Sequence, residues 1–90
     1  MPAVEREVSL VNPHGLHARP ISRVVELSRR FQAQVEIEFQ GRTASGRSVL
    51  ELMSLGAGPG SKLTLRADGP DAEGLVDALD ELIAGGFGEP

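Results

Sequence analysis

Two histidines and an arginine lie close together near the start of the chain, at His14, His17 and Arg19. A neutral imidazole nitrogen can attack phosphorus and hold the phosphoryl group through an N–P bond. The ordinary histidine pKa of about 6.5 leaves much of this side chain neutral near pH 7. An arginine two residues further along can offer a charged fork to phosphate oxygens. These residue types are therefore compatible with phosphoryl chemistry, in which His17 would be the nucleophile and Arg19 would contact the phosphate.

The surrounding sequence places His17 where a turn opens into a helix. Asn12-Pro13-His14-Gly15 interrupts the apolar run that precedes it, and Pro20 suits a first helical turn, where its missing N–H costs nothing. A helix N-terminus presents unpaired N–H groups and a partial positive charge, both of which favour phosphate binding. The predicted position of His17 therefore agrees with the chemistry of its side chain.

Other interpretations of the two histidines remain open from the residues alone. An exposed histidine in a loop is most often an ordinary loop residue. The three-residue spacing of His14 and His17 is compatible with a metal pair, but the chain has no cysteine and no third histidine. We therefore expect neither a metal nor a cofactor. The sequence shows no second acid or base beside His17 and no nucleotide-binding loop, which disfavours a stand-alone enzyme.

The size of the chain favours one small domain that acts together with a partner. Its 90 residues suffice for a single core over residues 1–90, and a domain of this size has little room for a deep active site. Gly85, Gly86 and Gly88 predict a flexible tail over residues 85–90. We expect a monomer.

Several function classes are disfavoured by the composition. The chain has no cysteine, no apolar leader and no apolar run long enough to span a bilayer, so we expect a cytoplasmic protein without membrane insertion. The net charge is −4, with +2 on residues 1–47 and −6 on residues 48–90. Because nucleic-acid binding usually needs a basic surface with aromatic side chains, we expect no nucleic-acid partner.

Hydrophobic periodicity predicts the elements that must position His17. Alternating apolar residues predict strands over residues 4–11, 34–39, 42–44 and 62–66. Apolar stripes predict a helix over 19–31, a short helix after Ser48 and a last helix between Asp71 and Gly85. The order β-α-β-β-α-β-α indicates the α+β class, as an antiparallel open-faced sandwich. The stripes of the two longer helices comprise Ile21, Val24, Val25, Ser28, Phe31, Ala72, Leu75, Val76, Leu79, Leu82 and Ile83.

A second informative segment follows Ser48, which is a natural N-cap for a short helix. Four of the next five residues are apolar, namely Val49, Leu50, Leu52 and Met53. Core packing is the ordinary explanation of such residues. Because one short helix cannot turn all four inward, we expect at least one or two to remain exposed as a partner surface.

Two blocks of the sequence resemble motifs of one known family. Gly15-Leu16-His17-Ala18-Arg19-Pro20 resembles the phosphohistidine motif of HPr, the carrier of the bacterial phosphotransferase system. The block from Gly46 to Gly56 resembles the regulatory-serine segment of that family, and the spacing between the blocks matches without a gap. The resemblance covers essentially the whole chain. It implies a four-stranded antiparallel sheet that carries three helices on one face.

The resemblance also implies roles for individual residues. His17 matches the histidine phosphorylated on Nδ1, Arg19 the phosphate contact and Pro20 the start of the first helix. Ser48 matches the serine that HPr kinase/phosphorylase modifies in some bacteria. The residues implied to bind partners are Pro20, Arg23, Arg47, Val49, Leu50 and Met53. Departures at His14, Glu26 and Glu51 concern the choice of partner rather than phosphoryl transfer.

The implied function is a relay. Enzyme I, phosphorylated by phosphoenolpyruvate, would phosphorylate His17, and His17 would phosphorylate enzyme IIA domains in sugar uptake. Two alternatives stay open: a regulatory module recognised through Ser48 by a regulatory protein, and a nitrogen-branch paralogue that serves no sugar permease. Arg19, Arg23, Arg29 and Arg47 could form a basic rim around His17 that steers acidic partners, although scattered arginines usually mark only a solvated face.

Overall fold

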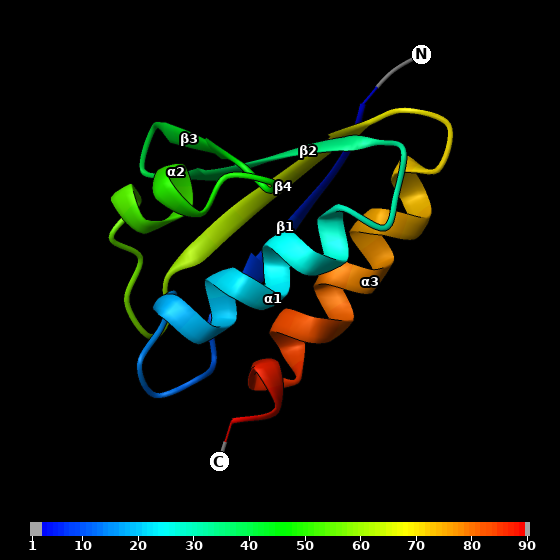
Figure 1. Cartoon of the computed structure of the whole chain (residues 1–90). Coiled ribbons are helices and arrows are strands. Elements are labelled where there is room, and N and C mark those ends of the chain that lie inside the picture. Colours follow the sequence, from blue (N-terminus) through cyan, green and yellow to red (C-terminus); the bar gives the residue numbers. More distant parts are fainter. Residues whose placement is uncertain (1–2, 90) are drawn as a thin grey trace.

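The computed structural model describes residues 3–89 and contains the predicted elements in the predicted order (Figure 1). The strands are β1 (Val4–Ser9), β2 (Gln34–Phe39), β3 (Arg42–Ser45) and β4 (Lys62–Asp68). The helices are α1 (Ala18–Ser28), α2 (Val49–Ser54) and α3 (Ala72–Ala84), followed by a short 3-10 helix, η1 (Gly86–Gly88). No helix within residues 3–89 combines the length and apolar character needed to cross a membrane.

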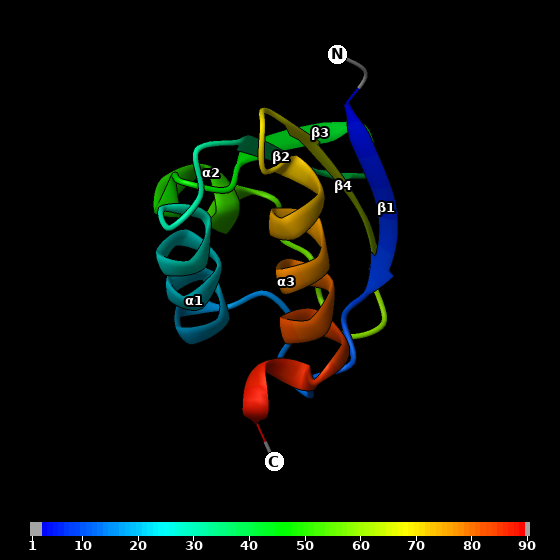
Figure 2. The same cartoon turned by 90° about the vertical axis from the view of Figure 1, so that its right-hand side faces the viewer.

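The four strands form one antiparallel sheet in the order β1-β4-β2-β3. Val8 lies opposite Leu63, and Ile37 pairs with Leu65 on one side and Ala44 on the other. The helices lie on one side of this sheet, as the turned view shows (Figure 2). An antiparallel sheet can leave its other face in water, where the charged residues of the alternating strands belong. The predicted α+β open-faced sandwich is confirmed.

The core lies between the apolar sheet face and the stripes of α1 and α3. Val8, Val35, Ile37, Leu63 and Leu65 are buried on the sheet side. Every predicted stripe residue of the two helices is buried or packs partly buried against this core. The periodicity of the sequence therefore located the core correctly, because burial on one face is what the alternation encodes.

Element boundaries differ slightly from the predictions. The first strand ends at Ser9 rather than residue 11, and the first helix ends at Ser28 rather than residue 31. The predicted hairpin turn is confirmed at Gln40 and Gly41, whose φ angles of 51° and 81° belong to a tight two-residue turn.

The C-terminal segment corrects the expectation of a flexible tail. Phe87 is only 1% exposed and belongs to the core, so residues 85–89 fold back onto the domain. Its φ of 59° lies between positive values at Gly86 and Gly88, which turns the chain sharply after α3. The glycines thus serve a tight turn rather than flexibility. Pro90 lies outside the described residues.

Asp71 ties the start of α3 to the chain that follows α1. It occupies the N-cap position of α3, yet its carboxylate accepts the N–H groups of Gln32 at 3.0 Å and Ala33 at 2.7 Å. These two backbone hydrogen bonds hold the pKa of Asp71 below its usual value of 3.8. The two longer helices are therefore fastened to each other by an ionised side chain.

We expect Asp71→Asn to lower the free energy of unfolding at pH 7, because an amide oxygen cannot replace two carboxylate oxygens. A lowered folded-state pKa contributes stability above the unfolded value, and this is lost as pH falls through the folded value. The difference between wild type and variant should therefore shrink below about pH 4. Urea unfolding at several pH values measures it. A constant difference between pH 7 and pH 2 would contradict the assignment.

Candidate functional site

The loop between β1 and α1 is clamped against a second loop. Leu16 N donates to the carbonyl of Ala57 at 2.9 Å, and Gly15 N donates to Asn12 O at 3.2 Å. Gly15 has a φ of +63°, and a Cβ there would lie 2.7 Å from Ala57 O and from the carbonyl carbon of Gly58. Only glycine permits both this backbone conformation and this approach. The clamp determines where the next residues, His17 and Ala18, begin the helix.

His17 is the N-cap residue of α1, and its ring is not used for capping. Its φ and ψ are extended, −111° and −168°, and its side chain makes no capping hydrogen bond. Within residues 3–89, the N–H groups of Ala18 and Arg19 have no backbone partner outside the helix. The first turn contains no acidic residue. The start of a helix whose first N–H groups are unpaired is a place where an anion such as phosphate can bind.

The His17 ring is held from one side only. Its side chain is 40% exposed, and Nε2 lies 2.9 Å from Oε2 of Glu89. The ring of His14, which is itself exposed, stands edge-on with a centroid distance of 5.6 Å. One ring nitrogen thus faces a carboxylate, while Nδ1 has no hydrogen-bond partner among the described residues.

Glu89 corrects the expectation that no second acid lies near His17. The carboxylate is only 13% exposed and also accepts from Nδ2 of Asn12 at 2.9 Å. The Asn12 hydrogen bond, aided by His17, holds the pKa of Glu89 below its usual value of 4.5 against the opposing effect of partial burial. The signal that the sequence analysis missed is Phe87. A large apolar residue in a glycine-rich terminal segment indicates that the segment packs against the core rather than extending into solvent.

The predicted arginines separate into two groups. Arg19 is exposed at the start of α1, and no ion pair involves it within the part of the chain described. Arg29 caps the other end of α1, and Arg47 donates to the carbonyls of Phe31 and Ala33 at 2.7 and 3.3 Å. An 11-residue helix is about 16 Å long, so Arg29 and Arg47 lie far from His17. The expected rim of four arginines around His17 is therefore wrong.

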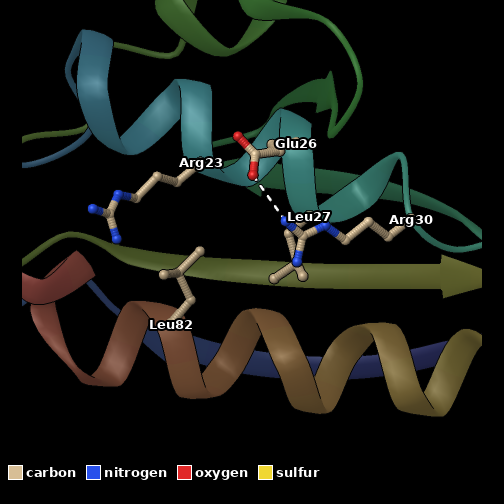
Figure 3. A pocket seen from close by; sticks show the side chains of 5 residues that line it. All are labelled: Arg23, Glu26, Leu27, Arg30 and Leu82. Atoms are coloured by element: carbon tan, nitrogen blue, oxygen red, sulfur yellow. Dashed lines mark hydrogen bonds and ion pairs between the residues drawn. The ribbon is translucent and has the colours of Figure 1, made fainter.

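A shallow groove between α1 and α3 is separate from this site. Figure 3 shows its lining, with Arg23 and Leu27 from α1 and Arg30 just after that helix, opposite Leu82 of α3. Glu26 pairs with Arg30 at 2.9 Å. Arg23 is exposed, and a Cβ at Gly88 would lie 3.9 Å from its Nη1. The groove is lined by no histidine, serine or threonine of residues 3–89, so it offers no side chain of the kind that accepts a phosphoryl group.

The segment around Ser48 has the expected cap and an exposed apolar surface. The Ser48 hydroxyl accepts from Glu51 N at 3.1 Å, and the Glu51 carboxylate reaches back to accept from Ser45 N at 2.9 Å. Leu52 is buried, whereas Val49, Leu50 and Met53 are 48, 80 and 56% exposed. These three residues form the α2 patch, and the expectation that at least one or two of the four apolar residues stay exposed is confirmed. Pro20, by contrast, is buried and has little surface to offer a partner.

Comparison with known proteins agrees with this geometry. Residues 4–85 match the family model described as "PTS HPr component phosphorylation site". The phosphocarrier protein HPr of Cupriavidus necator is 41% identical over 86 residues, which are 96% of this chain and 97% of that protein. The chain belongs to the HPr family.

Other relatives and solved structures extend this assignment. A multiphosphoryl transfer protein of Salmonella typhimurium is 37% identical over 87% of this chain, which corresponds to 22% of that longer protein. The HPr crystal structure from Thermoanaerobacter tengcongensis has a TM-score of 0.93 and 34% identity, covering 97% of this chain and 98% of that one. The HPr structure from Bacillus anthracis has a TM-score of 0.86 and 36% identity, and the match covers 90% of this chain and 96% of that one. The family is one of phosphocarriers.

The clamp on this HPr-type site can be tested by comparing two glycines with positive φ. We expect Gly41→Ala to lower the free energy of unfolding by about 1–2 kcal/mol, because it adds only left-handed strain in open space. Gly15→Ala adds the same strain and a collision with the backbone of Ala57 and Gly58, so its loss should be larger. Urea denaturation measures both. Equal losses would show that the two loops separate easily.

Proposed function

We propose that this chain carries phosphoryl groups on His17, accepting them from enzyme I and passing them to enzyme IIA domains in sugar uptake. The observation that carries this proposal is the half-exposed imidazole at the N-cap of α1, beside the unpaired N–H groups of Ala18 and Arg19. These groups would stabilise the charge of a phosphoryl group on Nδ1. The membership of the HPr family supports the same role.

Arg19 is the side chain best placed to assist. Its guanidinium is exposed at the first turn and makes no ion pair with the described residues, so it could turn toward phosphate oxygens without breaking a contact. Neither the N-cap geometry nor a free arginine requires a cofactor. The N-cap and Arg19 are suited to a phosphoryl group that must be held briefly and then released.

Partner docking would use the α2 patch beside α1. Val49, Leu50 and Met53 present exposed apolar side chains, and surfaces of this kind mark interaction sites on small proteins. We propose that enzyme I and enzyme IIA domains cover this patch while they reach His17. Such a relay between soluble partners belongs in the cytoplasm. A nitrogen-branch relay would use the same site with other partners.

Regulation through Ser48 is a second candidate, favoured by its place at the start of α2. An HPr kinase/phosphorylase could modify its hydroxyl, and a regulatory protein could then recognise the phosphoserine. The hydroxyl already caps the helix, and the carboxylate of Glu51 lies over the same turn. A phosphate there would meet a like charge from Glu51, so this chain would be a poorer substrate than one without that carboxylate.

The carrier role predicts that His17→Ala abolishes phosphate acceptance while the protein stays folded. The ring is part-exposed and outside the core, so the free energy of unfolding should change by about 1 kcal/mol or less. The measurement is incubation with phosphoenolpyruvate and enzyme I, followed by detection of acid-labile phosphate. His14→Ala is the matched control and should label normally. Labelling of His17→Ala that equals wild type would refute the assignment.

The docking role of the α2 patch predicts that Ser48→Asp raises the apparent KM of enzyme I for this carrier. The new charge would lie at the edge of Val49, Leu50 and Met53, where apolar contact is needed. Ser48→Ala removes only the cap, at a cost of about 1 kcal/mol, and should leave KM unchanged. Initial rates and thermal unfolding on the same preparations separate the two effects. An unchanged KM for Ser48→Asp would remove the patch from the docking surface.

A further inference from the structure

We propose that Glu89, held in place by Asn12, is a positioning residue for His17: it keeps the proton on Nε2 and so presents Nδ1 as the nucleophile. This inference rests on the proposed carrier function. It concerns two contacts from the C-terminal segment, one to the His17 ring and one to the loop that precedes α1.

The first step of the argument is the chemistry of the contact. An ionised carboxylate has no proton and can only accept a hydrogen bond. Oε2 of Glu89 lies 2.9 Å from Nε2 of His17, so Nε2 must donate. In a neutral imidazole one nitrogen carries the proton and the other carries the lone pair. The lone pair is therefore on Nδ1.

Asn12 determines the position of this carboxylate. Its side chain is buried, and Nδ2 donates to Gly15 O at 2.6 Å and to Oε1 of Glu89 at 2.9 Å. Both neighbours are acceptors, so the amide can take only one orientation. The two oxygens of Glu89 thus have one partner each, Asn12 and His17. These two hydrogen bonds, from Asn12 to Glu89 and from His17 to Glu89, leave the ring little freedom to change its tautomer.

The backbone before Glu89 is built to hold it there. The Phe87 ring is buried while its φ is +59°, in the left-handed region that costs a residue with a side chain about 1–2 kcal/mol. Such strain persists only where the surroundings enforce it. The segment after α3 lies at the same end of the molecule as the start of α1 (Figures 1 and 2). Phe87 therefore anchors the turn that brings Glu89 to His17.

The contact also suits the step itself. The Nδ1 lone pair attacks phosphorus, the N–P bond to the donor nitrogen breaks, and its electron pair stays on that nitrogen. The ring then carries phosphorus on Nδ1 and the proton on Nε2, with a positive charge spread over both nitrogens. A carboxylate at Nε2 stabilises this positive charge. The ring loses the positive charge again when the phosphoryl group passes to the next acceptor.

The test compares Glu89→Gln with Glu73→Gln, which removes the same charge from the exposed first turn of α3. Nitrogen-15 NMR of the imidazole reports the tautomer. We expect the Nε2–H form to predominate in wild type and Glu73→Gln, and a mixture in Glu89→Gln. The rate of phosphorylation by enzyme I should fall about tenfold or more in Glu89→Gln alone. Part of the rings would then hold the unreactive tautomer, and the positive charge that forms on the ring would lose its carboxylate. Thermal unfolding shows whether each variant is folded.

A second phosphoryl donor separates failure of this inference from failure of the carrier function. Phosphoramidate, a small-molecule donor, needs no partner protein and loses ammonia as the N–P bond to the ring forms. We expect phosphate on Nδ1 in wild type, and some on Nε2 once Glu89 is replaced. Wild type that reacts at Nδ1 with phosphoramidate but not with enzyme I would refute the carrier proposal alone.

Three results would overturn the positioning role. Glu89→Gln could retain both the wild-type tautomer and rate, or could react faster, which would make the contact a brake. Glu89→Asp, which restores the charge on a shorter side chain, should recover part of the Nε2–H population. If it recovers none while Glu73→Gln is normal, the carboxylate is not what holds the proton.

Discussion

The buried amide of Asn12 holds together the two segments that meet at His17. It donates one hydrogen bond to the loop before α1, at Gly15 O, and the other to Glu89 after α3. The first of these bonds is buried and the second is partly buried. Because an unpaired polar group in the interior is costly, the two bonds favour one arrangement of these segments over others. The place of the imidazole relative to the unpaired N–H groups of α1 therefore depends on Asn12, a side chain that makes no hydrogen bond to the ring itself.

The charge distribution differs between the two longer helices, which lie side by side on the same face of the sheet. Four arginines lie on or just after α1, whereas α3 carries Glu73, Asp77, Asp80 and Glu81. Arg6 of β1 neutralises part of this acidity through contacts to Asp77 at 2.7 Å and Asp80 at 3.3 Å. The net −4 thus conceals a basic helix that begins at His17. An acidic partner would approach that helix and be repelled by its neighbour.

Much of the fold and the centre of the site followed from residue patterns. Period-two alternation located the strands, helical stripes located the core, and the sequence around His17 placed this residue correctly at the start of a helix. The geometry of this candidate site could be predicted because its elements are local: a histidine, a proline and an arginine within one helical turn. Ser48 is local in the same way, since a cap and its helix are adjacent in the chain.

What the chain could not reveal are the contacts between distant residues. Arg47 seemed free to join His17, yet carbonyls 14 and 16 positions away bind it at the other end of α1. Glu89 stands 72 positions from His17, and only the closing of α3 over the sheet brings the two together. The sequence by itself determined which residues form elements and which histidine lies at the start of a helix, because those depend on neighbours along the chain. The tertiary structure decided the partner of the ring, since hydrogen bonds between remote segments form only where packing leaves no other arrangement.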